Sequence, residues 1–391
     1  MNAGVGIHDL SVATGHHVLD LGLLAERIGV DPDKYRIGLG QSEFSVPAPD
    51  EDVVTMGAAA ALPILRRHGS QGIRTLLFAT ESGVDQSKSA GIYVHRLLGL
   101  PAQCRVVELK QACYSATAGL QFALGLVARN PDERVLVIAS DVARYELDSP
   151  GEPTQGAGAV AMLIGADPAL VELEPVTGLH SADIDDFWRP NDRSTALVDG
   201  HGSIGAYLDS LLGAWEDYQD RGGLAAERID RFCYHQPFTR MAVKAHRALA
   251  ERVDGMPAED ILVGSTTYNR RLGNTYTASV YLALAALLDS EDDLAGRRIG
   301  FFSYGSGSVG EFFTGFVKPD YQDARRRAET LRALDARVPL DVDQYRALHA
   351  GAEVGSFTDV DTEQVTAGPF RFAGVRGGAR RYEPSLTTLR P

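Results

Sequence analysis

Strand-like apolar runs alternate with helix-like segments along this 391-residue chain. The clearest runs are 74–80, 134–141 and 156–164, and each is apolar along its length rather than at every second residue. A run without alternation is typical of a strand that is buried on both faces. Segments 53–67 and 87–98, before and after the first run, are expected to be helices. This order predicts an α/β fold with a mostly parallel sheet.

The two halves of the chain also repeat one another weakly. Residues 113–117 (CYSAT) match residues 275–279 (TYTAS), and an uncharged helix-like segment follows each match. A strand-like run precedes each match, ending at Glu81 in the first half and at His235 in the second. Matched elements in the same order indicate a duplicated structural unit.

Duplication would direct equivalent ends of strands and helices toward a shared centre. Open α/β sheets bind ligands at such ends. The residues expected there are Glu81, Cys113, His235 and Asn274. We expect a first half over residues 1–170, which contains Cys113, and a second half over residues 171–391, which begins with an insertion.

Cys113 is expected in the first turn of a helix over residues 116–127, a segment with almost no charge that should be buried on all sides. The unpaired N–H groups and the dipole at a helix N-terminus lower the pKa of a thiol and make it nucleophilic. The alternative is that Cys113 only packs, because cysteine is often a buried core residue.

A thiolate nucleophile needs a base or an electrostatic partner. His235 is the one histidine of ten expected at the end of a core strand. Glu81 also follows a core strand, and burial raises the pKa of a glutamate so that it can move protons near neutral pH. Convergence of Cys113, Glu81 and His235 would support acyl transfer to sulfur, followed by proton transfer with a second substrate.

A glycine-rich turn at residues 302–308 supplies backbone N–H groups that could approach an oxyanion. A tight turn that needs positive φ would have the same composition. Residues 305–310 also spell G-x-G-x-x-G, but the apolar segment 312–317 after them is expected to be a strand. A dinucleotide site requires a helix there, so nucleotide chemistry is disfavoured.

Residues 177–221 are expected to form an irregular polar insertion, of the kind that commonly makes an active-site wall. Asp183, Asp185 and Asp186 within it could ligate a divalent metal. Their spacing matches no known metal loop, so a solvated acidic turn is favoured and no metal site is expected.

Residues 323–334 are expected to form a charged surface helix. The run Arg325-Arg326-Arg327 at its start is interpreted as a solvated face rather than a binding patch. The formal net charge of the chain is −14. An acidic chain repels polyphosphate backbones, so nucleic acid is not an expected partner.

The chain has three cysteines, Cys104, Cys113 and Cys233, with no C-x-x-C and no apolar N-terminal segment. This pattern does not indicate secretion, a disulfide framework or structural zinc, so a cytoplasmic location is expected. No charge-free run of about 18 apolar residues occurs, so no membrane span is expected.

Six motifs carry a resemblance to one family. They are ATESGVD at 79–85, QACY at 111–114, GEPTQGAG at 151–158, YHQPFT at 234–239, GNTYT at 273–277 and FSYGSG at 302–307. Together they are similar to 3-hydroxy-3-methylglutaryl-CoA synthase, and the similarity extends from the first strand to about Lys318. The resemblance implies a thiolase-like fold, with two duplicated βαβαβ-type halves in a layered α/β/α/β/α core, and a homodimer.

The resemblance also implies a reaction. Cys113 would take the acetyl group of acetyl-CoA, Glu81 would handle the proton of its methyl group during carbon–carbon bond formation, and His235 would polarise acetoacetyl-CoA. Water would then release the product, with no cofactor beyond the CoA thioester substrates. Implied contacts to the acyl portion come from Tyr145, Thr154, Ser203, Asn274 and Ser306, implied contacts along the CoA arm come from Asp31 and Lys244, and Asp186 would support acetylation. Independently of the resemblance, Lys244 with Arg240 one helical turn before it supplies the positive charge that a phosphorylated ligand needs.

One branch of the family adds β-branches to polyketide chains and takes its acyl groups from acyl carrier protein. Ser115 with Gly119 and the segment 244–247 (KAHR) are similar to that branch. The segments 153–156 (PTQG) and 186–190 (DFWRP) are similar to the mevalonate-pathway branch, which is favoured. An inactive dimeric scaffold of the same fold is a third alternative, which the presence of all three implied catalytic residues disfavours.

Overall fold

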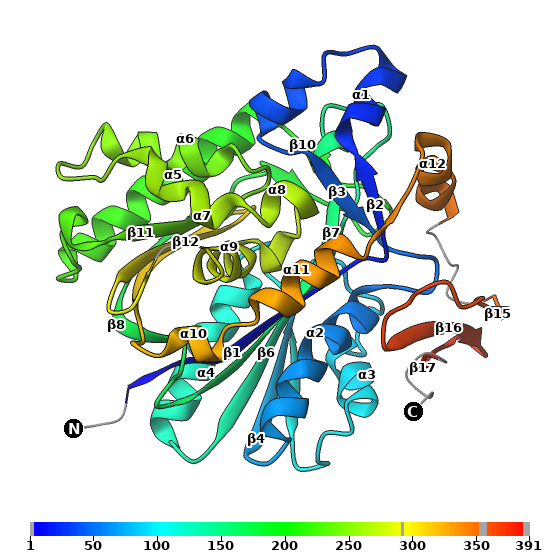
Figure 1. Cartoon of the computed structure of the whole chain (residues 1–391), viewed down its shortest axis with the longest axis horizontal. Helices are drawn as coiled ribbons and strands as arrows, with labels where there is room; N and C mark the ends of the chain where they lie inside the picture. Colours follow the sequence, from blue (N-terminus) through cyan, green and yellow to red (C-terminus); the bar gives the residue numbers. More distant parts are fainter. Residues whose placement is uncertain (1–3, 291–292, 352–357, 386–391) are drawn as a thin grey trace.

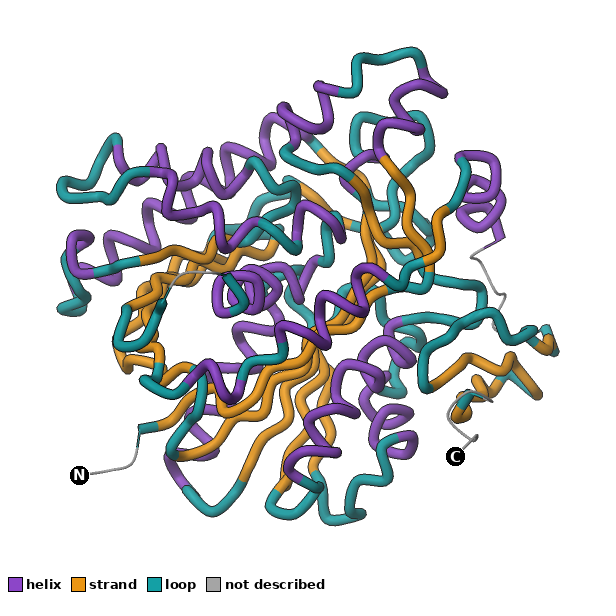
Figure 2. Tube along the Cα trace, in the orientation of Figure 1, coloured by secondary structure: helices purple, strands orange, loops and turns teal. Residues whose placement is uncertain are grey.

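The computed structural model describes residues 4–290, 293–351 and 358–385. In this part of the chain, a nine-stranded sheet has the strand order β11-β12-β13-β8-β1-β7-β6-β4-β5 (Figures 1 and 2). Its strands are β1 (Val5–Thr14), β4 (Ile73–Ala79), β5 (Arg105–Leu109), β6 (Arg134–Ala143), β7 (Gly156–Ala166), β8 (Val171–Ser181), β11 (Arg231–Tyr234), β12 (Arg298–Gly305) and β13 (Val309–Val317). The helices that cover the sheet are α2 (Val53–His68), α3 (Ala90–Leu97), α4 (Ser115–Arg129), α5 (Gly200–Asp220), α6 (Met241–Ala250) and α9 (Ser279–Leu288).

The strand pairing occurs twice. In the first half β1 pairs antiparallel with β7, β7 pairs antiparallel with β6, and β6 pairs parallel with β4. In the second half β8, β13, β12 and β11 have the same three relations in the same order. A short antiparallel contact between β1 and β8 joins the two units. The predicted duplication of an α/β unit is therefore confirmed.

Helices α4 and α9 lie between the two halves of the sheet, where Figure 1 shows α9 nearly end-on. Leu120 of α4 and Leu284 of α9 share one apolar cluster with Val137 of β6 and Phe301 of β12. Every residue of α9 is buried, as its uncharged sequence predicts. The expectation that α4 is buried on all sides is wrong, because the Phe122 side chain is 57% exposed on the opposite face of that helix.

Four helices cover the outer faces of the sheet. Alternate residues of β6 point outward, and Ile138 packs in one cluster with Ile64 of α2 and Val94 of α3. In the second half, residues of β12 and β13 pack against α5 and α6 in a separate cluster. The layers therefore follow the predicted order α/β/α/β/α. No helix within the described residues is both long and apolar enough to cross a lipid bilayer.

The sheet is not mostly parallel, so that prediction is wrong. Five of its eight neighbouring strand pairs are antiparallel, and parallel pairing is confined to β4 with β5 and β6 and to β11 with β12. A strand without polar alternation is buried on both faces, and here helices cover both faces of antiparallel strands as well. The uninterrupted apolar composition of these strands therefore reflects their burial and does not indicate whether they pair parallel or antiparallel.

Two other segments differ from expectation. Residues 177–221 are largely regular, because β8 continues to Ser181 and the 21-residue helix α5 follows from Gly200. The segment 323–334 is not one helix, since α10 (Tyr321–Ala324) ends before α11 (Arg327–Asp335) begins. Two short helices, α7 (Val263–Thr266) and α8 (Asn269–Leu272), precede α9.

Smaller sheets flank the core. Strands β2 (His17–Asp20), β3 (Glu43–Val46) and β14 (Val338–Pro339) form one of them. Apolar side chains of helices α1 (Leu21–Ile28) and α12 (Val342–Gly351) pack in one cluster with those of β2 and β3. A two-stranded sheet consists of β9 (Phe187–Trp188) and β10 (Leu197–Val198). Near the C-terminus, β15 (Val360–Asp361), β16 (Phe370–Arg376) and β17 (Ala379–Pro384) form a sheet that packs on α2 and α3.

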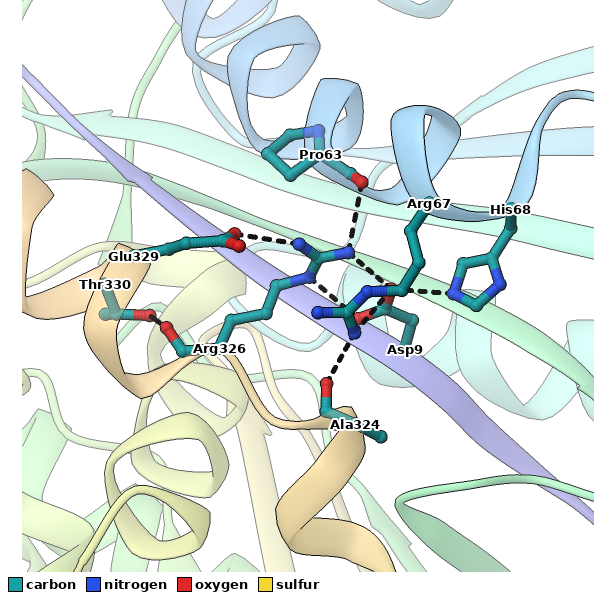
Figure 3. Close-up of polar contacts among 8 residues, drawn as sticks. All are labelled: Asp9, Pro63, Arg67, His68, Ala324, Arg326, Glu329 and Thr330. Carbon is teal, nitrogen blue, oxygen red and sulfur yellow. Dashed lines mark hydrogen bonds and ion pairs between the residues drawn. The ribbon is translucent and has the colours of Figure 1, made fainter.

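A buried ion cluster ties the segment between α10 and α11 to the first half (Figure 3). The Asp9 carboxylate on β1 has no exposed surface and accepts bonds from Arg326 Nε at 2.9 Å and Nη2 at 2.6 Å. Arg67 and His68 at the end of α2 contact the same carboxylate. The side chain of Arg326 is only 4% exposed, so the interpretation of residues 325–327 as a solvated face is wrong for this residue.

We predict that Arg326→Ala lowers the free energy of unfolding by about 3 to 5 kcal/mol, because it leaves the buried Asp9 carboxylate without its bidentate partner. Arg332→Ala, which removes an exposed arginine from α11, is the matched control and should change stability by less than about 0.5 kcal/mol. Urea unfolding followed by circular dichroism measures both. Equal stabilities of the two variants would contradict a structural role for the Asp9 cluster.

Candidate active site

Glu81 and Cys113 are brought together at one end of the first half. Glu81 follows β4 by two residues, and Cys113 precedes α4 by two residues. Their side chains lie next to each other, and each shifts the pKa of the other. The rings of Tyr145, which follows β6, and of Tyr276 in the second half enclose the thiol in a small apolar cluster. Cys113 thus lies at the boundary between the two halves of the fold.

Burial raises the pKa of the Cys113 thiol well above its usual value, and the nearby carboxylates of Glu81 and Asp141 raise it further. The expected lowering of this pKa is therefore wrong. Cys113 lies ahead of the first turn of α4, and burial together with two nearby carboxylates determines the direction of its pKa shift. Burial, reinforced by Asp141, also raises the pKa of Glu81 to about 8. A carboxyl with that pKa can take up or release protons near neutral pH.

Asp141, at the end of β6, connects loops from both halves. Its Oδ1 accepts hydrogen bonds from the backbone N–H of Glu81 at 2.9 Å, the N–H of Ser82 at 3.1 Å and the hydroxyl of Thr80 at 2.8 Å. Its Oδ2 accepts from the N–H and the hydroxyl of Thr277 in the second half. Asp141 has no exposed surface. Many converging donors stabilise a buried carboxylate, so Asp141 can hold the Glu81 turn against the second half.

The loop that carries Cys113 is closely packed against the glycine-rich turn. Ala112 has a φ of 43°, a conformation that few non-glycine residues adopt. Gln111 Nε2 donates to the carbonyl of Ser306 at 3.3 Å. A Cβ atom at Gly305 would lie 2.5 Å from the Gln111 carbonyl oxygen, so only glycine permits this approach. The turn thus supports the nucleophile loop from the second half.

The expectation that this turn offers free N–H groups to an oxyanion is wrong at two positions. The Gly307 N–H donates to Asp186 Oδ1 at 2.9 Å, and the Ser308 N–H donates to the Ala182 carbonyl at 2.5 Å. Both donors are therefore already used inside the protein. The predicted strand after the turn is present as β13.

His235 lies directly after β11, as predicted. Its N–H donates to the Phe302 carbonyl at 2.8 Å, which extends the pairing of β11 with β12 by one residue. Tyr207 of α5 stacks on the imidazole and donates its hydroxyl to the His235 carbonyl at 2.9 Å. Burial lowers the pKa of His235 to about 3, so the ring is neutral at physiological pH. Its buried Nδ1 has no hydrogen-bond partner among the described residues.

Three of the residues expected at the acyl group lie in one connected set. Asn274 Nδ2 donates to the Tyr145 hydroxyl at 3.1 Å, and the Asn274 N–H donates to the Thr154 carbonyl at 3.1 Å. The Oδ1 atom of Asn274 accepts the N–H of Tyr276 at 2.9 Å. The amide side chain is therefore held from both halves of the chain.

Asp186 is buried, whereas Asp183 and Asp185 are exposed. The Asp186 carboxylate accepts the Tyr304 hydroxyl at 2.7 Å and lies 3.4 Å from the Ser203 hydroxyl. The interpretation as a solvated acidic turn is therefore wrong for Asp186, because its oxygens are used to hold β12 and α5. Within the described residues, no group of three or more histidine, cysteine or acidic side chains is arranged to hold a metal ion.

The segment after Asp186 forms a wall of the site, as expected for this insertion. Phe187 packs edge-on against the rings of Tyr145 and Tyr276, with centroids 6.0 Å from each. Arg189 Nη2 donates to the Glu81 carbonyl at 2.8 Å. Its positive charge lowers the pKa of Glu81 and partly offsets the effect of burial.

Two of the residues expected along the CoA arm, Arg240 and Lys244, lie at the start of α6. The Arg240 N–H donates to the Leu39 carbonyl at 2.8 Å, which joins this helix to the segment that follows Asp31. Lys244 is exposed, with its Nζ 5.3 Å from the centre of the Phe238 ring. Neither Arg240 nor Lys244 has an acidic ion-pair partner among the residues that the structure describes.

Sequence reasoning missed three residues that contact the reactive pair or hold its loop. They are Asp141, Arg189 and Tyr276. Asp141 could have been found, since an aspartate at the end of the clearest core strand resembles Glu81 in position. Arg189 and Tyr276 act from the second half, and no local pattern shows what they contact.

Comparisons with known proteins agree with the geometry. Residues 1–169 match the family described as "Hydroxymethylglutaryl-coenzyme A synthase N terminal", and residues 259–350 match "Hydroxymethylglutaryl-coenzyme A synthase C terminal". The hydroxymethylglutaryl-CoA synthase of Enterococcus faecalis is 40% identical over 382 residues, which cover 97% of this chain and 99% of that protein.

Two solved structures are also similar over nearly the whole chain. An HMG-CoA synthase complexed with CoA has 37% identity and a TM-score of 0.92, covering 98% of this chain and 100% of its own. The HMG synthase of the curacin biosynthetic pathway, complexed with holo donor-ACP, has 32% identity, a TM-score of 0.92 and the same coverage. These similarities confirm the thiolase-like fold. The chain therefore belongs to the hydroxymethylglutaryl-CoA synthase family of condensing acyltransferases.

Proposed function

We propose that the protein condenses acetyl-CoA with acetoacetyl-CoA to give 3-hydroxy-3-methylglutaryl-CoA and CoA. The observation that carries the proposal is the adjacent pair of Cys113 and Glu81, each of which shifts the pKa of the other, enclosed where the two halves meet. A buried thiol beside a carboxyl with a pKa near neutrality can form and then consume a thioester. Solved relatives carry CoA or a carrier protein, which supports a thioester substrate.

In the first step the sulfur of Cys113 attacks the carbonyl carbon of acetyl-CoA. The bond from that carbon to the CoA sulfur breaks, and CoA leaves with a proton. The high pKa of the Cys113 thiol means that its proton must be accepted as the sulfur attacks. The carboxylate of Glu81 is the adjacent acceptor, and Asp186 supports the turn beside the thiol.

In the second step Glu81 removes a proton from the methyl group of the acetyl thioester. The resulting carbon nucleophile attacks the keto carbon of acetoacetyl-CoA, whose oxygen takes up a proton. His235 is neutral, so it can donate one ring N–H to that oxygen without a change of charge. Water then cleaves the thioester to Cys113, which regenerates the thiol and leaves the carboxyl group of the product.

Substrate contacts are assigned to the surrounding groups. Tyr145, Thr154, Ser203, Asn274 and Ser306 are proposed to contact the acyl portions. Asp31, Arg240 and Lys244 are proposed to lie along the CoA arm, where two cations without ion-pair partners among the described residues suit its phosphates. The reaction requires no cofactor or metal beyond the CoA thioesters. We also propose that the two halves cover residues 1–170 and residues 171–391.

The functional unit is proposed to be a homodimer. β5 is an edge strand of the large sheet, and Val107 on it is 39% exposed. Phe122 on the adjacent helix α4 is 57% exposed. An unprotected edge with neighbouring apolar side chains is the kind of surface that a second copy covers.

A cytoplasmic location and a place in the mevalonate pathway are also proposed. The three free cysteines suit a reducing compartment.

The alternative is a β-branching synthase that uses acyl carrier protein. Its support is the similarity to the curacin synthase, whose identity of 32% is lower than the 40% shared with the Enterococcus enzyme. Both solved structures have the same TM-score, so the fold does not separate the two substrates. The CoA enzyme is therefore preferred.

Incubation with radiolabelled acetyl-CoA should label the protein stoichiometrically, and Cys113→Ala should abolish labelling while the fold stays intact, because only the sulfur is lost. Acid-stable label and circular dichroism measure the two properties. Cys233→Ala, at a fully buried cysteine away from Glu81, is the control and should keep the label. Much faster labelling from acetyl-carrier protein than from acetyl-CoA at equal concentration would favour the polyketide alternative.

Glu81→Gln should acetylate Cys113 more slowly, because glutamine cannot accept the thiol proton, but the acetylated enzyme should still form, and its condensation should be slowed by about 10²- to 10⁴-fold, the usual contribution of a general base. In the wild type, a carboxyl with a pKa of about 8 is protonated below that pH and ionised above it. The condensation rate should therefore rise through about pH 8, where half of the Glu81 carboxyl is ionised, and level off only well above that pH. Single-turnover condensation from the acetylated enzyme measures this profile, and a flat profile would point to a different base.

His235→Ala should impair binding of the acceptor, acetoacetyl-CoA, and leave the reaction with the donor, acetyl-CoA, nearly unchanged. It should acetylate Cys113 within twofold of the wild-type rate, yet its KM for acetoacetyl-CoA should rise about thirtyfold, equivalent to about 2 kcal/mol from a lost polar contact. Because burial keeps His235 neutral, the wild-type acceptor step should show no inflection near pH 6.5. Steady-state kinetics with varied acetoacetyl-CoA measures the KM. An unchanged KM together with slow acetylation would assign His235 to the donor.

A further inference from the structure

Helix α12 contacts the backbone of Tyr145 beside the site. His349 Nε2 donates to the Tyr145 carbonyl at 2.9 Å. Gln155 links the backbone N–H of Tyr145 to the same helix. Its Oε1 accepts that N–H at 2.8 Å, and its Nε2 donates to the hydroxyl of Tyr345 on α12. Both backbone groups of Tyr145 are therefore held, directly or through Gln155, by one face of α12.

Further contacts fix α12 in place. The Arg144 guanidinium donates to the His349 carbonyl, and Arg346 forms an ion pair with Asp148. Tyr345 is 2% exposed and belongs to the apolar cluster with α1, β2 and β3. The helix is thus anchored to the core on one side and bonded to segment 144–155 on the other. An anchored donor can set the position of the backbone that it contacts.

A cavity of about 350 Å³ lies beside this segment, lined by residues of β3, the end of β6 and α12. Ala143, Arg144 and His349 are in its wall. Among the described residues, the cavity leaves one side of the backbone before Tyr145 without close packing, so directional bonds help to determine where this backbone lies.

The position of Tyr145 matters to the thiol. Its ring packs with Cys113, and its hydroxyl accepts a hydrogen bond from Asn274. We propose that His349 is a positioning residue for acetyl transfer, which acts through the Tyr145 carbonyl to hold the tyrosine ring against Cys113. This inference rests on the proposed function, because it concerns the rate at which Cys113 is acetylated.

The test compares His349→Ala with His349→Gln, whose amide can still donate to the Tyr145 carbonyl. In rapid-quench acetylation, His349→Ala should lower the rate constant at saturating acetyl-CoA about tenfold, as expected for a misplaced contact group, and should leave the half-saturating concentration within twofold. His349→Gln should recover at least half of the lost rate. His95→Ala, which removes the same kind of bond to the Pro101 carbonyl at 2.9 Å, is the matched control and should acetylate normally.

A second measurement separates positioning from loss of stability. If His349 acts through the Tyr145 ring, then His349→Ala combined with Tyr145→Ala, which removes that ring, should be no slower than the slower single variant, whereas a general loosening would add to the effect of Tyr145→Ala. Additive effects, or a His349→Ala rate within twofold of wild type, would overturn the role proposed for His349 and leave the proposed function standing. A wild-type protein that acetyl-CoA does not label would overturn the proposed function and the inference together.

Discussion

The Asp141 carboxylate is buried where the two halves of the fold meet, and the arrangement of the site depends on it. One oxygen accepts the backbone donors of the Glu81 turn, and the other accepts both donors of Thr277. A buried carboxylate is costly unless donors surround it, so the two loops and the anion stabilise one another. The same negative charge raises the pKa of Glu81 and of the Cys113 thiol.

Duplication explains why so many groups reach one place. Equivalent strands β4 and β11 end just before Glu81 and His235, and equivalent helices α4 and α9 pack together between the two halves of the sheet. The uncharged sequence of α9 is a consequence of this layer, because every one of its residues is buried. Since apolar burial holds the two halves together, polar groups at their common edge can be arranged for chemistry.

Burial and nearby charge affect the protonation of Cys113 and of Glu81 differently. Burial and neighbouring carboxylates disfavour the thiolate of Cys113, while burial of Glu81 brings its pKa to about 8. A thiol next to a carboxyl of this kind is suited to proton transfer coupled to attack rather than to a preformed thiolate. His235 experiences burial without a nearby charge, so its ring stays neutral. Three titratable groups thus differ in behaviour because their surroundings differ.

Local sequence determined the buried strands, the duplication and the positions of Glu81, Cys113 and His235 at the ends of elements, because burial and turn chemistry leave a pattern along the chain. Resemblance to a family added the expected roles. Strand direction, the burial of Asp186 and Arg326, and the raised pKa of Cys113 were decided only by the tertiary structure. Each of these depends on groups far apart in the chain, such as Asp9 with Arg326, and a linear pattern does not record which distant charge will face a given side chain.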